Sequence, residues 1–129
     1  MAKTNSKAVD LALAHCEAWS NHDWDTARKA LADDVTVTST TTMPGAPKAD
    51  LDGPDAYMEG LRAFAEMVVP GTLQVNAGVG DERNALVQVT VQTDGPPFGP
   101  LTLHGARLYL FDEDDKIKDE QVIFVGVAR

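Results

Sequence analysis

Apolar side chains recur every three to four residues in three segments of the first 70 positions. This spacing is typical of helices that bury one side. It predicts a first helix from about Ser6, with an apolar arc wide enough to contact more than one neighbour. A second helix is expected from the N-cap Asp23 to the segment "ADDV", and a third from Pro54 to the break at Pro70 and Gly71.

The period changes to two in the second half of the chain, where apolar and polar residues alternate. The alternation predicts four strands at about 72–80, 84–93, 101–111 and 116–127. An earlier strand, "VTVTSTTT", follows the second helix, and "MPGAPKADLDG" is expected to be a loop because it carries proline and glycine without periodicity. This order predicts an α+β domain whose helices lie on one face of a mostly antiparallel sheet.

The expected strand 84–93 raises the question of which of its faces turns toward the helices. One face carries Val87, Val89 and Val91, and the other carries Leu86, Gln88, Thr90 and Gln92. The ordinary arrangement puts the valines under the helices. The last two strands are apolar on both faces, so we expect both faces of the sheet to be covered. We therefore interpret the pattern in the opposite way, with the glutamine face toward the helices and the valine face away from them. The valines, with Leu108 and Ile123, would then pack against a second copy of the chain as a homodimer.

Length and charge restrict the classes of protein that this chain can represent. Its 129 residues predict a single domain over 1–129, with residues 1–6 disordered. A net charge of −9 argues against a nucleic-acid partner. No apolar run is long enough to span a bilayer, and no basic amphipathic segment favours a membrane surface. The lone Cys16 and the absence of a secretory signal favour the cytoplasm.

Three segments carry a resemblance to a known family: "AHCEAWSNHDWDTARKALADDVTVTS", "GPDAYMEGLRAFAEMV" and "RLYLFDEDDKIKDEQVIFV". Over about residues 7–127 the chain resembles the nuclear-transport-factor-2-like superfamily, and most of all its SnoaL-like and ketosteroid-isomerase-like branch. The resemblance implies a curved sheet wrapped by three N-terminal helices into a cone. It also implies a pocket inside the cone and dimerisation through the outer sheet face.

The resemblance also indicates which side chains face the pocket. The three catalytic positions of ketosteroid isomerases fall at His15, Ser39 and Arg107. None of these carries the tyrosine or aspartate that the family uses, so steroid isomerisation is not expected. The candidates for binding a ligand are Trp19, Trp24, Ser39, Tyr57, Leu61, Phe64, Gln88, Thr90, Gln92, Val122 and Phe124. Their mixture of aromatic and polar groups suits a small ligand with oxygen functions, although such aromatic residues are more often ordinary core or the rim of a pocket.

His15, Arg107, Tyr109 and Glu120 are the candidate catalytic residues. A buried histidine can act as a general acid or base, or it can be a neutral core histidine. Arg107 and Glu120 would form a buried pair if both faced inward, but they could also be a structural ion pair or exposed strand ends. Members similar to limonene-epoxide hydrolase use an arginine and two carboxylates to activate water, whereas Tyr109 stands at one of those carboxylate positions.

No metal or cofactor is expected, because the histidines lack ligand spacing and no phosphate-binding loop is present. The sequence favours a pocket protein that acts on a small hydrophobic oxygenated molecule, such as a polyketide- or terpene-like compound. An isomerase, cyclase or hydrolase working by acid/base chemistry fits best. A non-catalytic binding or accessory domain, and an assembly module with a closed dry core, are the alternatives.

Overall fold

The computed structural model describes residues 6–41, 49–96 and 99–128. Two helices, of which the second is short, precede a pair of strands and a third helix in the first half, and a four-stranded meander follows. In chain order the elements are α1 (Lys7–Ser20), α2 (Trp24–Lys29), β1 (Leu31–Thr41), β2 (Ala49–Asp52), α3 (Pro54–Ala65), β3 (Gln74–Gly80), β4 (Asn84–Thr93), β5 (Leu101–Phe111) and β6 (Ile117–Ala128).

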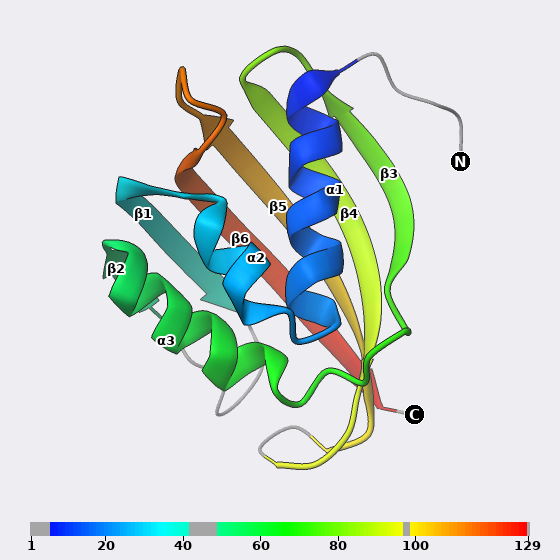
Figure 1. The fold of residues 1–129 in the computed structure, drawn as a ribbon. Coiled ribbons are helices and arrows are strands. Elements are labelled where there is room, and N and C mark those ends of the chain that lie inside the picture. The colour runs from blue at the N-terminus through cyan, green and yellow to red at the C-terminus, as the bar shows by residue number, and fades with distance from the viewer. Residues whose placement is uncertain (1–5, 42–48, 97–98, 129) are drawn as a thin grey trace.

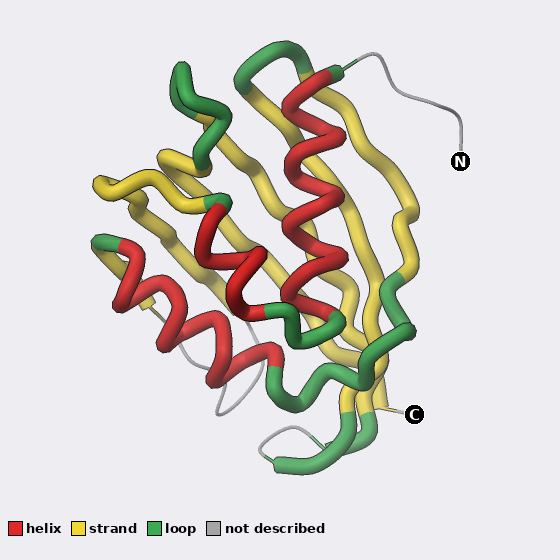
Figure 2. The backbone as a smooth tube through the Cα atoms, in the orientation of Figure 1, coloured by secondary structure: helices red, strands yellow, loops and turns green. Residues whose placement is uncertain are grey.

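The six strands form one curved sheet, and all three helices lie on the same face of it (Figures 1 and 2). The strand order is β2-β1-β6-β5-β4-β3. Neighbouring strands are antiparallel except β1 and β6, which run parallel. The expected α+β cone with a mostly antiparallel sheet is therefore confirmed, and its interior lies between the helices and the sheet.

Each helix begins where the sequence predicts. The side chain of Ser6 accepts a hydrogen bond from the Val9 backbone N–H and donates one to the Asp81 carbonyl. Ser6 is thus ordered and buried, which corrects the expectation that disorder extends through residue 6; residues 1–5 lie outside the described range. Asp23 caps α2 through the Thr26 N–H, and Pro54 opens α3.

The ends of the second and third helices differ from the prediction. The second helix ends at Lys29, because Leu31 already pairs with Ile117 in the sheet. The third ends at Ala65 rather than at Pro70, since Val68 makes an isolated bridge to Thr93. In both places a long-range strand pairing replaces the last turn that local spacing favours.

A short edge strand lies in the segment predicted as a loop. β2 pairs antiparallel with β1, and Leu51 lies opposite Val37. Its four residues, "ADLD", alternate between apolar and polar, but the run is too short to predict a strand beside proline and glycine, and the pairing with β1 gives it its conformation. Residues 43–48 of the predicted loop, and Thr42 at the end of the predicted strand before it, lie outside the described range.

The predicted orientation of β4 is wrong. Val87, Val89 and Val91 are 0%, 2% and 2% exposed and pack into the core under the helices. Gln88 and Gln92 lie on the opposite face and are partly exposed. Arg107 is the register partner of Val87, so it shares the inner face with the valines rather than with the glutamines. The apolar arc of α1 needs an apolar surface to pack on, and the valine face of β4 supplies it. The ordinary arrangement, with the valines under the helices, therefore holds.

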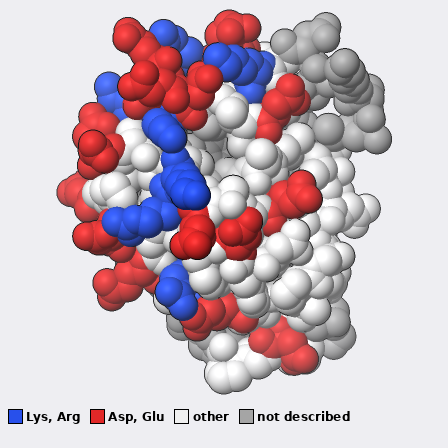
Figure 3. Space-filling model, viewed as in Figure 1, with Lys and Arg blue, Asp and Glu red and all other residues white. Residues whose placement is uncertain are grey.

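The outer face of the sheet carries several exposed apolar side chains: Leu86, Leu108, Leu110, Ile123, Val125 and Val127. On the helical face, basic side chains lie between acidic ones (Figure 3). Within the described ranges, no helix is long and apolar enough to cross a membrane.

Candidate functional site

A buried ion pair lies on the inner face of the sheet. Arg107 comes from β5 and Glu120 from β6, and the Arg107 Nη1 atom lies 2.8 Å from Glu120 Oε2. Their side chains are 5% and 1% exposed. The alternation of the two strands, which are neighbours in the sheet, turns both side chains toward the helices. Two opposite charges are thus held away from water in contact with each other.

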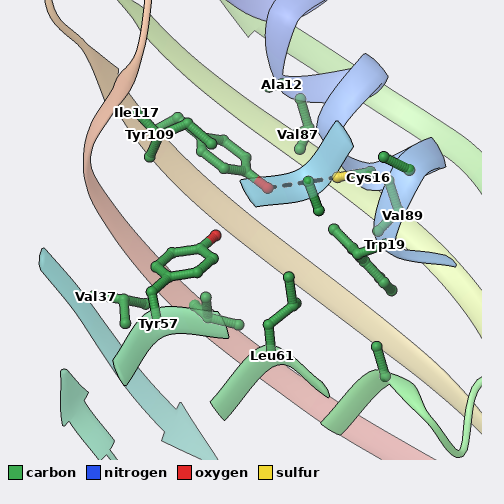
Figure 4. Packing of buried hydrophobic residues seen from close by; sticks show 14 of the residues in the cluster. Ala12, Cys16, Trp19, Val37, Tyr57, Leu61, Val87, Val89, Tyr109 and Ile117 are labelled. Atoms are coloured by element: carbon green, nitrogen blue, oxygen red, sulfur yellow. Dashed lines mark hydrogen bonds between the residues drawn. The ribbon is translucent and has the colours of Figure 1, made fainter. Parts of the chain in front are cut away.

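The second oxygen of the carboxylate also has a partner. Tyr57 reaches in from α3 and donates its hydroxyl hydrogen to Glu120 Oε1. Tyr57 itself is 3% exposed. Figure 4 shows Tyr57 of α3 and Tyr109 of β5 with their hydroxyl groups in the same interior space. Glu120 therefore accepts one hydrogen bond from the helical layer and one from the sheet.

Aromatic rings hold the guanidinium group of Arg107 in place. Its central carbon lies 4.5 Å from the centroid of the Trp19 ring and 5.5 Å from that of Phe64. Such contacts are favourable and fix the plane of the group. Among the described residues, Glu120 is its hydrogen-bond partner, and the Nε atom is buried without one. Most of the five N–H donors of an arginine are therefore unused here.

Burial and the neighbouring side chains together set the protonation of these three residues. Burial raises the pKa of Glu120, and the Arg107 charge and the hydrogen bonds from Tyr57 and Arg107 oppose the rise without cancelling it. Burial acts to lower the pKa of Arg107, but its neighbours Tyr109 and Glu120 outweigh this effect, so the pKa is raised and the group stays charged. Burial and the nearby Glu120 raise the pKa of Tyr57, which keeps its hydroxyl protonated as a donor.

A second layer of polar side chains lies behind this group. His15 makes edge contacts with the rings of Tyr57 and Tyr109, at centroid distances of 6.0 and 6.1 Å. Neither of its ring nitrogens has a hydrogen-bond partner among the described residues. Burial and the Arg107 charge lower the pKa of His15 to about 3, and the Ala27 backbone opposes them. His15 is therefore neutral at pH 7.

Cys16 belongs to the same inner layer. Its Sγ atom lies 3.5 Å from the Tyr109 hydroxyl oxygen (Figure 4). Burial raises the pKa of Cys16. Burial also raises the pKa of Tyr109 well above its usual value. Both groups stay protonated at neutral pH, which makes the thiol a poor nucleophile.

A pocket with a cavity volume of about 80 Å³ opens beside the ion pair. Its polar lining consists of Tyr57, Arg107 and Glu120, and its apolar lining consists of Val37, Leu51, Gly60, Leu61, Phe64, Val122 and Phe124. This volume is below the range of about 300–1,000 Å³ that is common for small-molecule sites. The pocket therefore has room for a small group, with a carboxylate and a cation at its wall.

The structure brings together only part of the predicted site. Arg107, Glu120, Tyr57, Leu61, Phe64, Val122 and Phe124 line the pocket, and Trp19 packs under Arg107. His15 and Tyr109, expected as catalytic residues, lie in the inner layer and do not line it. Ser39 pairs with Val122 in the sheet, but its side chain is outside the described part.

Four predicted ligand-binding residues lie away from the pocket. Trp24 stacks on the His22 ring, with centroids 5.2 Å apart, and contacts Arg62. Thr90 bonds to Asn76 and lies 3.3 Å from the His104 ring on the outer sheet face. Gln92 accepts a hydrogen bond from Thr102 on that face, and Gln88 is partly exposed there. The wrong orientation of β4 accounts for the last three.

Three pocket residues escaped the sequence prediction. Val37 lies on β1, where the alternation of "VTVTST" carried a signal. Gly60 interrupts a predicted helix, and an isolated glycine in a helix is a sign of close packing. Leu51 lies in the predicted loop, where the alternation of "ADLD" is too short to predict a strand. Among the described residues, no group of three or more His, Cys, Asp or Glu side chains is arranged to hold a metal ion.

Comparisons with known proteins agree with this architecture. A family model described as "SnoaL-like domain" matches residues 12–120, and no curated protein sequence matches the chain. A solved structure from Kribbella flavida DSM 17836 is 25% identical, with a TM-score of 0.74 over 91% of this chain and 85% of that chain.

Two further solved structures show likeness in the fold alone. A SnoaL-like polyketide cyclase candidate from Shewanella denitrificans OS-217 is 13% identical, with a TM-score of 0.71 over 92% of this chain and 90% of that chain. A steroid delta-isomerase from Pseudomonas aeruginosa is 14% identical, with a TM-score of 0.68 over 95% of this chain and 84% of that chain.

Proposed function

Because the chain belongs to the SnoaL-like domain family, we propose that it is an enzyme that uses its own side chains as acid and base on a small, hydrophobic, oxygenated compound. The membership confirms the family expected from the sequence. One observation carries the proposal: Glu120 is a buried carboxylate at the wall of a pocket, with a raised pKa. A carboxylate of raised basicity in an apolar pocket is suited to take a proton from a substrate.

The proposed reaction begins when the Glu120 carboxylate removes a proton from a carbon beside a carbonyl group. The electron pair of the broken C–H bond forms an enolate, whose negative oxygen accepts a hydrogen bond from an unused N–H of Arg107. Tyr57 keeps the carboxylate oriented. In an isomerisation, Glu120 then gives the proton to another carbon of a conjugated enolate, and the C=C bond shifts. In a cyclisation, the enolate carbon attacks a second carbonyl, whose C=O π bond breaks, and the alkoxide formed takes the proton from Glu120.

His15 and Tyr109 support this chemistry from behind the pocket. His15 is neutral at pH 7 and touches the rings of Tyr57 and Tyr109 at their edges. Neither side chain lines the pocket. Their proposed role is to hold Tyr57 and the interior packing in place, and the proton transfer is assigned to Glu120.

The test uses proton exchange, which needs no knowledge of the natural substrate. Acetone and cyclopentanone are incubated in D₂O with the protein, and loss of the signal of the protons beside the carbonyl is followed by NMR. The wild type is expected to accelerate exchange, and Glu120→Gln should lower the rate by about 100-fold or more. Glu113→Gln, which changes an exposed carboxylate in the turn before β6, serves as the matched control. Equal rates in wild type and Glu120→Gln would remove Glu120 from the mechanism.

A second candidate function is non-catalytic binding, favoured by a different observation. Both oxygens of Glu120 already accept hydrogen bonds from the protein, and the cavity is small. A domain that only binds a ligand, or that serves in assembly, would have this arrangement as a structural group. In that case the ketones would bind without any exchange of their protons.

A homodimer is also part of this proposal. The exposed apolar side chains on the outer sheet face, among them Leu108 and Ile123, support it. Val87, Val89 and Val91 no longer belong to the proposed interface, because they are buried under the helices.

A further inference from the structure

Gly60 lies inside α3, where a glycine weakens the helix and where its backbone has no unusual conformation. A side chain at this position would meet a neighbour. A Cβ atom built on Gly60 would lie 2.6 Å from Cδ1 of Leu51, closer than such atoms approach each other. The space beside Gly60 is therefore filled by the side chain of Leu51, which comes from the edge strand β2.

Leu51 and Gly60 form the outer side of the pocket. Both line it and both are partly exposed. The three polar lining residues are deeper, since Tyr57, Arg107 and Glu120 are 3%, 4% and 1% exposed. Leu51 also lies opposite Val37 in the sheet, and Val37 is another lining residue. Leu51 and Gly60 are therefore the lining residues that lie nearest the surface.

The cavity behind Leu51 is small for an aromatic ring. Its volume is about 80 Å³, whereas a dry engineered cavity that holds benzene measures about 150 Å³. The charges at its wall balance, with one cation and one carboxylate in contact. A charged occupant would leave one charge buried without a partner, so a neutral occupant is favoured.

We propose that Leu51, lodged against Gly60, is the residue that determines specificity in this pocket. It restricts the occupant to the narrow end of a neutral carbonyl compound and excludes an aromatic ring. The inference rests on the proposed function for the identity of the site, but it concerns binding and not turnover. Leu51 acts as a wall of the pocket, and the position of its side chain depends on the missing side chain of residue 60.

The test measures the binding of three neutral ketones of increasing size: acetone, cyclopentanone and acetophenone. Dissociation constants are obtained by NMR titration, with the resonances of Val122 and Phe124 as reporters of the pocket. Leu51→Ala should bind acetophenone at least 10-fold more tightly than the wild type, with a change of less than threefold for acetone. Leu51→Phe should bind cyclopentanone at least 10-fold more weakly. Leu51→Val, a milder change, should fall between wild type and Leu51→Ala.

Gly60→Ala tests whether the glycine acts through Leu51. The added methyl should change the affinity for cyclopentanone at least threefold in the wild-type background, because Leu51 must move. In the Leu51→Ala background the same substitution should have no effect. Leu86→Ala, which shortens an exposed leucine on the outer sheet face, is the matched control and should bind all three ketones like the wild type.

Two negative outcomes separate this inference from the proposed function. If wild type and Leu51→Ala bind acetophenone equally while smaller ketones bind, the proposed role of Leu51 in specificity is wrong, and the pocket remains a ligand-binding site. If none of the ketones binds any of the proteins, both the pocket proposal and the role of Leu51 fall. An equal effect of Gly60→Ala in both backgrounds would overturn the coupling between the two residues.

Discussion

Arg107 and Glu120 show at the residue scale why the buried polar group favours function over stability. Removing two charges from water costs several kcal/mol per ion, and their attraction only about compensates for this cost. Well-packed apolar residues would stabilise the core at least as well. The pair is moreover completed by Tyr57 and held by the Trp19 ring, which fixes its geometry at the pocket wall. Burying this pair lowers the stability of a core, whereas its fixed geometry is useful at a binding or catalytic site.

His15 gives a prediction about acid stability. Its pKa falls from 6.5 in the unfolded chain to about 3 in the folded protein, so unfolding takes up a proton between these values. Stability is then lost as the pH falls, by about 1.4 kcal/mol per pH unit. His15→Leu should remove this dependence. Between pH 6.5 and pH 5, the free energy of unfolding of the variant should fall by about 2 kcal/mol less than that of the wild type, as measured by urea unfolding.

The comparison between variants matters because Glu120 acts in the opposite sense. Its folded pKa is raised, so its contribution falls as the pH rises from 4.5 through that pKa. Glu120 is present in both proteins, and its effect cancels in the difference. His104→Leu, on the outer sheet face, is the matched control and should keep the acid dependence of the wild type. The same slope in His15→Leu and wild type would show that His15 is not the responsible group.

At the scale of elements, the capping of α2 gives the next prediction. This helix has six residues and begins at Asp23, whose side chain accepts the Thr26 N–H at 3.3 Å. Asp23→Ala leaves that N–H without its partner and should lower the free energy of unfolding by about 1 kcal/mol. Asp23→Asn keeps a capping oxygen and should stay close to the wild type. Thermal and urea unfolding measure both, and equal losses in the two variants would contradict a capping role.

The starts of the elements were predictable from the sequence, and several ends were not. Ser6, Asp23 and Pro54 carry local chemistry that marks a helix start without any tertiary contact. The ends at Lys29 and Ala65 depend on strand pairings made far along the chain, and these leave no local pattern. The short strand β2 likewise depends on β1, whose edge it pairs with.

The site was predictable to the extent that strand alternation fixes it. The family resemblance places Arg107 and Glu120 in the pocket, and the alternation of β5 and β6 turns both inward, but the resemblance places the glutamines of β4 on the wrong side. The alternation along a strand predicts which residues share a face, but it does not determine which face is buried. The apolar arc of α1 decides the matter, because it needs Val87 and Val89 beneath it. Leu51 and Gly60 meet only in the folded chain.

At the scale of the whole molecule, the two faces of the sheet differ in how they are completed. The inner face is covered by three helices (Figure 1). On the outer face one part is polar, and its side chains bond to one another, as Thr102 does to Gln92 and Asn76 to Thr90. The other part is apolar and exposed, with Ile123 at 63% and Val127 at 54%. An apolar area of this kind is typical of an interaction surface, and a self-complementary one closes as a symmetric pair.

The dimer is therefore expected to depend on the outer face and not on the pocket. The wild type should sediment as a dimer at tens of micromolar protein. Ile123→Lys should sediment as a monomer, because a lysine repeated across a symmetric interface brings like charges together. Its circular dichroism spectrum should be unchanged. Val69→Lys changes an apolar residue that is 37% exposed on the connection between α3 and β3 and should leave the dimer intact. A wild type that sediments as a monomer at these concentrations would contradict the dimer. If Ile123→Lys remained a dimer, the interface would have to lie on another surface. Neither result would change the assignment of Glu120 and Leu51 to the pocket, since both lie on the other side of the sheet.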